Sequence, residues 1–272
     1  MINIIRFAAE LLSRGKVLKR HISVNGIKAP ILITPDSQLK YLKLGKNPFD
    51  RDLINIAERF LSPDSNVWDI GANVGVFTIA AASVANKGSV LSVEPDIWLA
   101  GLIQRTANLT GNKKKDIRVL PAAISEYNSV ATLIIAKRGR ASNALGGISG
   151  RSQMGGIRNK QYIPTITIDN LLKSFPKPDF IKIDVEGAEL LAIRGAAEVI
   201  SSVRPIFYIE VGIRYSNEIK KFFRTEKYRL FDGESYVPIE NCTFNTFFVP
   251  EEKVQSDFIS HIERLNTNWA SF

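Results

Sequence analysis

From residue 66 onward, short hydrophobic runs alternate with longer stretches of helical character. The runs are four to six residues long, rich in Val and Ile, and bounded by turns: Val67 to Ile70, Ser89 to Val93, Ile117 to Leu120, Phe180 to Ile183 and Ile206 to Val211. Runs of this kind are typical of buried parallel strands. The stretches between them, at 76–85, 97–109, 188–201 and 216–224, have helical length. The alternation predicts an open α/β sheet covered by helices on both faces, followed by an antiparallel pair at 228–231 and 243–249.

The first part of the chain follows a different pattern. We expect a helix at 3–13, then two short strands at 22–24 and 27–34, joined through Asn25-Gly26, a dipeptide that favours a hairpin turn. A helix is predicted at 51–61. The sequence therefore predicts an N-terminal helix and hairpin extension, residues 1–48, and one larger domain, residues 49–272. Residues 138–160 are rich in Gly, Ser, Arg and Asn without hydrophobic periodicity, and we expect a flexible basic loop there.

Composition narrows the class of protein. With 272 residues, of which 45% are hydrophobic, the chain can form one packed domain. No apolar run reaches the roughly 20 residues of a membrane-spanning helix, and the mixed N-terminus does not resemble a secretory signal. A single cysteine, Cys242, cannot form an internal disulfide, which favours a cytoplasmic location. Two histidines and one cysteine argue against a structural zinc site, and we assign no metal-ligating residues.

The net charge of +9 is unevenly distributed. Residues 111–160 contain ten Lys or Arg and only two acids, Asp116 and Glu126. Such a segment forms either a solvated basic face or a surface for an anionic acceptor, nucleic acid or lipid headgroups. The pattern leaves these alternatives open.

Candidate ligand chemistry lies at the ends of the first two predicted strands of the larger domain. The first strand leads into Asp69-Ile-Gly-Ala-Asn-Val-Gly75, in which Gly71 and Gly75 allow a ligand to approach the main chain before the next helix begins. Glu94, followed by Pro95, ends the second strand, where a carboxylate can accept hydrogen bonds from both hydroxyls of a ribose. The phosphate-binding motifs of dehydrogenases and P-loop ATPases are absent.

Six motifs, in order, resemble those of FkbM-type methyltransferases. They are 69–75, Val93-Glu-Pro95, Ala123-Ile-Ser-Glu126, Thr167-Ile-Asp169, Ile181-Lys-Ile-Asp-Val-Glu-Gly-Ala-Glu189 and Arg204-Pro205, and the resemblance covers about residues 50–250. It implies a class I methyltransferase fold, with a Rossmann-like, mostly parallel sheet of seven strands and an antiparallel last strand. It also implies S-adenosylmethionine as the cofactor and methyl donor, and usually O-methylation, often of a sugar hydroxyl.

The resemblance also implies roles for individual residues. Asp69 and Gly71 would hold the methionine end of the cofactor, Glu94 the ribose, and residues 122–125 would lie near the adenine. The complete set of expected cofactor-binding residues is Asp69, Gly71, Asn73, Gly75, Glu94, Pro95, Ala123, Ser125 and Asp184.

Methyl transfer to a hydroxyl requires an aligned acceptor oxygen and a group that takes its proton. Asp184 leaves the end of the fourth parallel strand and is the expected general base, with Glu186 as the expected carboxylate that orients the substrate. Two alternatives stay open for Glu186: it could cap the following helix, or bind a divalent ion together with Asp184. Glu210, at the end of the fifth strand, could line the acceptor pocket or be buried in an ion pair.

The leading hypothesis is an S-adenosylmethionine-dependent O-methyltransferase acting on a sugar, a glycan or another small molecule, which the basic segment would allow to be anionic. A nucleic-acid methyltransferase is the enzymatic alternative, but aromatic residues are sparse in the basic segment and no RNA-binding module is evident. A non-catalytic, cofactor-binding protein in peripheral contact with a membrane is the alternative from another class.

Overall fold

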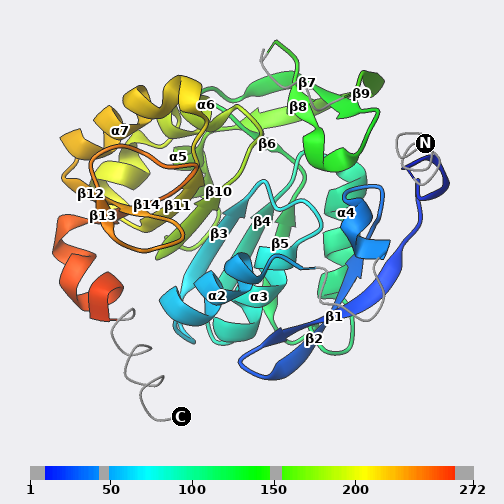
Figure 1. The fold of residues 1–272 in the computed structure, drawn as a ribbon, viewed down its shortest axis with the longest axis horizontal. Helices are drawn as coiled ribbons and strands as arrows, with labels where there is room; N and C mark the ends of the chain where they lie inside the picture. Colours follow the sequence, from blue (N-terminus) through cyan, green and yellow to red (C-terminus); the bar gives the residue numbers. More distant parts are fainter. Residues whose placement is uncertain (1–9, 43–48, 148–154, 261–272) are drawn as a thin grey trace.

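The computed structural model describes residues 10–42, 49–147 and 155–260. Its largest element is a mixed sheet with the strand order β13-β12-β14-β11-β10-β3-β4-β5 (Figure 1). The strands are β3 (Asn66–Ile70), β4 (Ser89–Val93), β5 (Asp116–Leu120), β10 (Phe180–Ile183), β11 (Ile206–Glu210), β12 (Tyr228–Asp232), β13 (Pro238–Ile239) and β14 (Asn245–Pro250). All seven predicted strands are present, and β14 pairs antiparallel with both β11 and β12, as expected for the last strand. The two-residue edge strand β13 is an addition that the sequence pattern did not predict.

Successive residues of the central strands point into two separate cores. Val67 of β3 lies in the core shared with α2 (Arg51–Phe60), α3 (Val76–Val84) and α4 (Ile97–Ala107). Its neighbour Trp68 lies in the core shared with α5 (Ile168–Leu171), α6 (Glu189–Arg194) and α7 (Ser216–Thr225). Because a strand presents alternate side chains to opposite faces, both faces of the sheet are covered, which confirms the predicted α/β class.

The N-terminal hairpin is also confirmed, with strands β1 (Leu18–Val24) and β2 (Ile27–Ile33) in antiparallel register. Asn25 and Gly26 have positive φ angles of 48° and 77°, as their tight turn requires. The hairpin packs its apolar side chains into the same core as α3 and α4. Most of the predicted helix at 3–13 and the predicted boundary after Pro48 fall at residues 1–9 and 43–48, outside the described residues.

One expectation needs correction. Residues 138–160 were expected to form a loop without regular structure, but three parts of this stretch are ordered: η2 (Arg140–Ser142), β8 (Ala144–Leu145) and the start of β9 (Ile157–Ile166). The strands β8 and β9 form a second sheet with β6 (Ala123–Ile124) and β7 (Ser129–Ala136), in the order β6-β9-β7-β8. The first half of β9 is mostly polar and largely exposed, and its long-range pairing with β7 gives it order that local periodicity does not predict. Residues 148–154 lie outside the described part.

The helix predicted at 188–201 is interrupted. α6 ends at Arg194, and a π-helical turn, η4 (Val199–Val203), follows. A Cβ atom on Gly195 would lie 2.4 Å from the carbonyl oxygen of Ser125, so the chain passes too close to the second sheet for any other residue. The hydrophobic periodicity continues through this point and therefore conceals the break.

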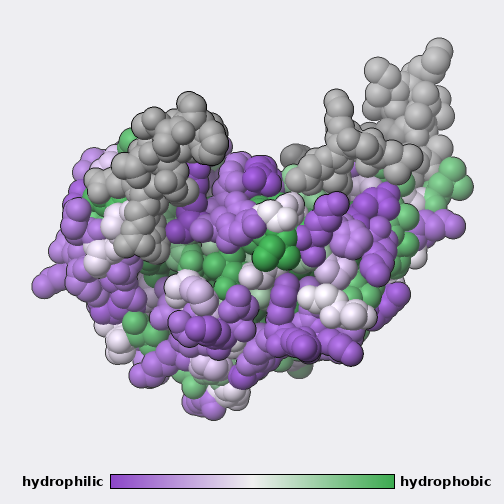
Figure 2. Space-filling view, turned by 90° about the horizontal axis from the view of Figure 1, so that it is seen from below, coloured by the Kyte–Doolittle hydropathy of each residue, from purple (hydrophilic) through white to green (hydrophobic). Residues whose placement is uncertain are grey.

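The face of the molecule shown in Figure 2 is predominantly polar. On this face, hydrophobic residues form small patches among the hydrophilic ones. Among residues 10–42, 49–147 and 155–260, no helix combines the length and apolar character of a membrane span.

Candidate active site

The loop after β3 is held in contact with the ends of β4 and β10. The Gly71 N–H donates to the Val93 carbonyl over 2.9 Å, and the Asp184 N–H donates to the Ile70 carbonyl over 3.0 Å. Gly71 has a φ of 75°, and a Cβ atom there would lie 1.7 Å from the Asp184 carbonyl oxygen. Both the backbone angle and this close approach require glycine.

The Glu94 carboxylate lies beside the same loop. Its Oε2 accepts from the Asn73 N–H and its Oε1 accepts from the Asp96 N–H, both over 2.8 Å. Glu94 is only 6% exposed. Burial raises its pKa to about 8, although the two N–H donors act in the opposite direction. Each carboxylate oxygen accepts one of these bonds and has capacity for another, so the group can still accept ligand hydroxyls.

Beneath the loop, Lys182 connects three acceptors. Its ammonium donates to the Gly71 carbonyl over 3.0 Å and lies 3.4 Å from Asp69 Oδ1 and 3.6 Å from Asp184 Oδ2. Burial lowers the pKa of Lys182, but the carboxylates of Asp69 and Asp184 raise it by more than burial lowers it. The net shift of the pKa is therefore upward, and the amine stays charged. Thr78 donates to the other oxygen of Asp69 over 2.6 Å. These contacts fix the positions of the loop and of the Asp184 carboxylate.

A pocket opens above this framework, with about 620 Å³ of empty space, part of it open to solvent. We call it the glycine-loop pocket. Gly71, Asn73, Glu94 and Pro95 line one side of it, and apolar side chains line another. The apolar wall comprises Leu99, Ala122, Ile124, Leu133, Ala144 and Leu145, of which Ile124, Leu133, Ala144 and Leu145 belong to the second sheet. The inserted sheet therefore completes a cavity that begins at the carboxyl ends of β3 and β4.

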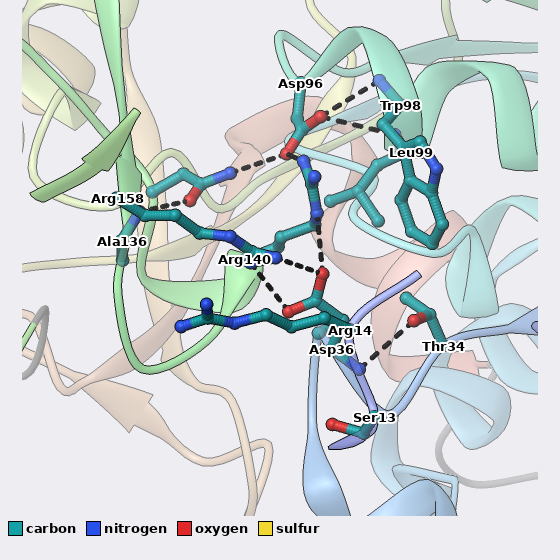
Figure 3. A network of polar contacts seen from close by, with 12 residues as sticks. Ser13, Arg14, Thr34, Asp36, Asp96, Trp98, Leu99, Ala136, Arg140 and Arg158 are labelled. Carbon is teal, nitrogen blue, oxygen red and sulfur yellow. Dashed lines mark hydrogen bonds and ion pairs between the residues drawn. The ribbon is translucent and has the colours of Figure 1, made fainter. Parts of the chain in front are cut away.

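A network of ion pairs connects the second sheet to the rest of the chain (Figure 3). Asp36, just after the N-terminal hairpin, accepts from both terminal nitrogens of Arg158, over 2.8 and 2.7 Å, and pairs with Arg140 over 3.1 Å. Arg140 also pairs with Asp96, which accepts from Asn143 over 2.8 Å. The network joins the hairpin, the inserted sheet and the start of α4.

This network explains the role of Arg140 and Arg158, which belong to the basic segment at residues 111–160. Arg140 and Arg158 are only 14% and 17% exposed at their side chains. The Arg140 guanidinium also stacks 4.8 Å from the centre of the Trp98 ring and lines the glycine-loop pocket. These two cations thus hold the pocket closed on one side and do not form part of an open basic surface.

A second cavity, which we call the acidic pocket, adjoins the first. It has about 500 Å³ of empty space and is lined by Asp50, Asp52, Leu53, Lys182, Ile183, Asp184, Tyr208, Glu210, Phe244 and Asn245. Asp184 lines both cavities. Glu186 lines the glycine-loop pocket and a third cavity, beside Lys40 and Arg138. In the part of the chain that is described, no three His, Cys, Asp or Glu side chains are grouped to hold a metal ion.

The structure brings most of the expected site residues together. Gly71, Asn73, Glu94, Pro95, Ala123, Asp184 and Glu186 all line the glycine-loop pocket, and Glu210 lines the acidic pocket. Three expected cofactor residues line neither cavity. Asp69 is fully buried beneath the loop, Gly75 begins α3 with a φ of 83°, and the Ser125 N–H donates to Ile166 at the edge of the second sheet.

The residues after β10 bear on the alternative in which Glu186 caps the following helix. Glu186 has a φ of 52° and precedes α6, whereas Glu189, in the first turn, accepts from the Gly187 N–H over 2.8 Å. Glu189 therefore stabilises this helix start. The left-handed conformation of Glu186 is unusual for a residue with a side chain and turns the chain sharply between the cavities.

Sequence reasoning missed several residues of the site. Lys182 had a detectable signal, because a lysine inside a four-residue apolar strand must be paired when buried. Asp50 and Asp96 are the N-caps of α2 and α4, and an Asp before a helix carries no further signal of a site. Tyr208 is indistinguishable from other strand aromatics. Arg140 has no local signal, since its partners are distant in sequence.

The strand order β5-β4-β3-β10-β11-β14-β12, with only β14 antiparallel, and the ligand pocket at the ends of β3 and β4 define a class I methyltransferase. The model of the FkbM methyltransferase domain matches residues 69–230. The chain belongs to this family of S-adenosylmethionine-dependent methyltransferases.

Individual relatives are more distant. The chain is 26% identical over 195 residues to the hexuronic acid methyltransferase AglP of Haloferax volcanii, covering 66% of this chain and 75% of that protein. It resembles the crystal structure of an FkbM methyltransferase from Methylobacillus flagellatus, at 18% identity and a TM-score of 0.45. It also resembles the 16S rRNA methyltransferase RsmC of Thermus thermophilus, at 11% identity and a TM-score of 0.46. These two matches cover 69% and 85% of this chain but only 44% and 49% of the solved chains.

The residues of the glycine-loop pocket fit S-adenosylmethionine. The buried Glu94 carboxylate suits a ribose diol, and the wall of Leu133, Leu145 and Ile124 suits the flat face of an adenine. The backbone at Gly71 is open to close approach by the amino-acid end.

Proposed function

We propose that this protein transfers a methyl group from S-adenosylmethionine to a hydroxyl of a sugar. Glu94 accepts hydrogen bonds from the ribose, Ala122 to Ile124 and the second sheet enclose the adenine, and the acceptor enters the acidic pocket. The observation that carries the proposal is the position of Asp184, which lines both cavities and is therefore the carboxylate at their junction.

S-adenosylmethionine supplies a methyl group that is already activated by its sulfonium, so the chain's own residues chiefly orient the acceptor and take its proton. Asp184 is suited to accept that proton, since its side chain is 35% exposed and directed by Lys182 at 3.6 Å. Glu210 and Tyr208, on the neighbouring strand, line the same cavity and can hold other hydroxyls of the acceptor.

A sugar acceptor is supported by two independent lines. One is the relationship to a protein named as a hexuronic acid methyltransferase. The other is the chemistry of the acidic pocket, in which carboxylates accept hydrogen bonds from hydroxyls and the exposed ring of Phe244 offers a flat apolar surface. Carboxylates beside an aromatic ring suit a polyhydroxylated ring.

The test replaces Asp184 with asparagine. We expect Asp184→Asn to bind S-adenosylmethionine normally and to lose about 10²- to 10⁴-fold in transfer rate, because a general base contributes on this scale. Binding is measured by calorimetry and transfer by mass gain in single turnover on a panel of methyl pyranosides. Glu186→Gln, which changes a carboxylate facing a different pair of cavities, is the matched comparison and should lose far less. A fully active Asp184→Asn would remove this residue from the proposed role.

A further inference from the structure

The acidic pocket contains more negative than positive charge among its described residues. Asp50, Asp52, Asp184 and Glu210 line it, whereas Lys182 is its single described cation. The Lys182 ammonium already lies between Asp69 and Asp184, at 3.4 and 3.6 Å. Within the described chain, neither Asp50 nor Asp52 forms an ion pair, and the Asp50 side chain accepts only the Asp52 N–H, over 3.3 Å. A ligand in this cavity therefore meets the carboxylates of Asp50 and Asp52, whose charge Lys182 does not balance.

A buried hydroxyl also faces the pocket. Tyr208 is 5% exposed, lines the cavity, and its hydroxyl forms no hydrogen bond with any residue that the structure describes. Burial, followed by the nearby charges of Asp50 and Asp52, raises the pKa of Tyr208, so the phenol stays protonated and places its hydroxyl near those acids. The hydroxyl of this buried side chain is therefore available to a ligand that enters the cavity. This second observation indicates that the cavity is built to receive a polar molecule.

We infer that the acidic pocket binds an uncharged or amino-bearing sugar ring and discriminates against a ring that carries a carboxylate. This inference rests on the proposed function and specifies its acceptor. Neutral hydroxyls and an ammonium can donate to the carboxylates, and Tyr208 can donate or accept. A uronate would instead place a like charge beside Asp50 and Asp52, and such juxtapositions are strongly unfavourable. The preference is thus opposite to that indicated by the name of the hexuronic acid methyltransferase.

The inference also differs from the anionic acceptor that the basic segment allowed. Arg140 and Arg158 are engaged with Asp36 and Asp96 and do not line the acidic pocket. Lys40 and Arg138 line the third cavity, beside Glu186, and would be the alternative site for an anionic ring. The two locations therefore predict opposite preferences for acceptor charge.

The experiment compares matched acceptors. Methyl glucoside, galactoside and mannoside are each paired with the corresponding methyl uronide and with the 2-amino sugar, and kcat/KM for methyl transfer is measured for each at pH 7. We expect the best neutral or amino-bearing acceptor to exceed its uronide by at least about tenfold, which corresponds to about 1.4 kcal/mol. In Asp50→Asn/Asp52→Asn, this ratio should fall towards one, mainly through a lower KM for the uronide. Asparagine also caps helices well, so α2 should keep its start.

Asp64→Asn, an exposed acid that lines none of these cavities, is the control and should leave the ratio unchanged. A uronide that reacts as well as or better than its neutral partner would overturn the inference and indicate the third cavity. The absence of reaction with every pyranoside, while S-adenosylmethionine still binds, would also overturn the inference. Failure to bind S-adenosylmethionine, measured separately by calorimetry, would instead refute the proposed function.

Discussion

Replacing Gly71 with alanine should disrupt the site more than a Gly→Ala replacement at any other described glycine in a turn. The left-handed backbone at this position costs a residue with a side chain roughly 1–2 kcal/mol. The added Cβ would also lie 1.7 Å from the Asp184 carbonyl oxygen, so the loop and the end of β10 must separate by about 1 Å or more.

That separation strains two hydrogen bonds, from Asp184 N–H to Ile70 and from the Lys182 ammonium to Gly71, and a bond to a charged group contributes about 1.5–3 kcal/mol. We therefore expect Gly71→Ala to lose about 3 kcal/mol of stability or more, which lowers Tm by roughly 6 °C or more in a chain of this size. Affinity for S-adenosylmethionine should fall at least about 100-fold, since misplacement by about 1 Å has effects on this scale.

Gly26→Ala is the matched control for this change. Gly26 has nearly the same φ, 77° against 75°, but no atom within 4 Å of an added Cβ. The control should therefore show only the backbone cost, of roughly 1–2 kcal/mol, with unchanged cofactor affinity. Calorimetric unfolding and titration with S-adenosylmethionine measure both quantities. If Gly71→Ala bound the cofactor like the wild type, or were no less stable than Gly26→Ala, the assignment of Gly71 to a crowded junction at the site would be wrong.

Two further predictions concern the walls of the glycine-loop pocket. Because Glu94 has a pKa of about 8 in the empty protein and the ribose hydroxyls need an acceptor, binding should release a proton below that pH. Affinity for S-adenosylmethionine should then rise between pH 6 and 8, by up to about tenfold per pH unit, and level off above pH 8. Calorimetry should show a flatter pH dependence of this affinity in Glu94→Gln. A steep pH dependence in that variant would exclude Glu94 as its source. Asp36→Ala leaves Arg158 without its carboxylate and Arg140 with only Asp96, and should cost about 2–3 kcal/mol in denaturant unfolding together with weaker cofactor binding. Glu240→Ala, which breaks the exposed pair with Arg224, should cost no more than about 1 kcal/mol, and equal losses in the two variants would contradict a structural role for the network.

The parts of the fold that were predictable are those with strong local signals. The strands β3, β4, β10 and β11 are short apolar runs buried on both faces, so they follow directly from hydrophobicity. The edge strand β5 is only partly buried but carries the same kind of short apolar run. The Asn25-Gly26 turn fixes the N-terminal hairpin in the same local way. The second sheet was missed because β9 begins with polar, exposed residues and gains its order from pairing with β7.

In the candidate site, too, residues with a local sequence signal could be predicted and residues placed by long-range contacts could not. Gly71, Glu94 and Asp184 follow strands directly, and parallel strands bring their carboxyl ends to one edge, so their proximity could be predicted. Asp69 has the same sequence signal, yet it points beneath the loop towards Lys182 and Thr78. Arg140 and Asp36 meet across 104 residues, and no local pattern indicates such a pair. Tertiary contacts, not strand ends, determine these positions.

The most direct test of the account is a crystal structure of the protein with S-adenosylhomocysteine, the product of the donor. We predict both ribose hydroxyls on the Glu94 carboxylate, the adenine between Ile124 and the Leu133–Leu145 wall, and the sulfur beside Asp184 where the two cavities meet. A nucleoside bound elsewhere, or a glycine-loop pocket that stays empty at saturating ligand, would contradict it.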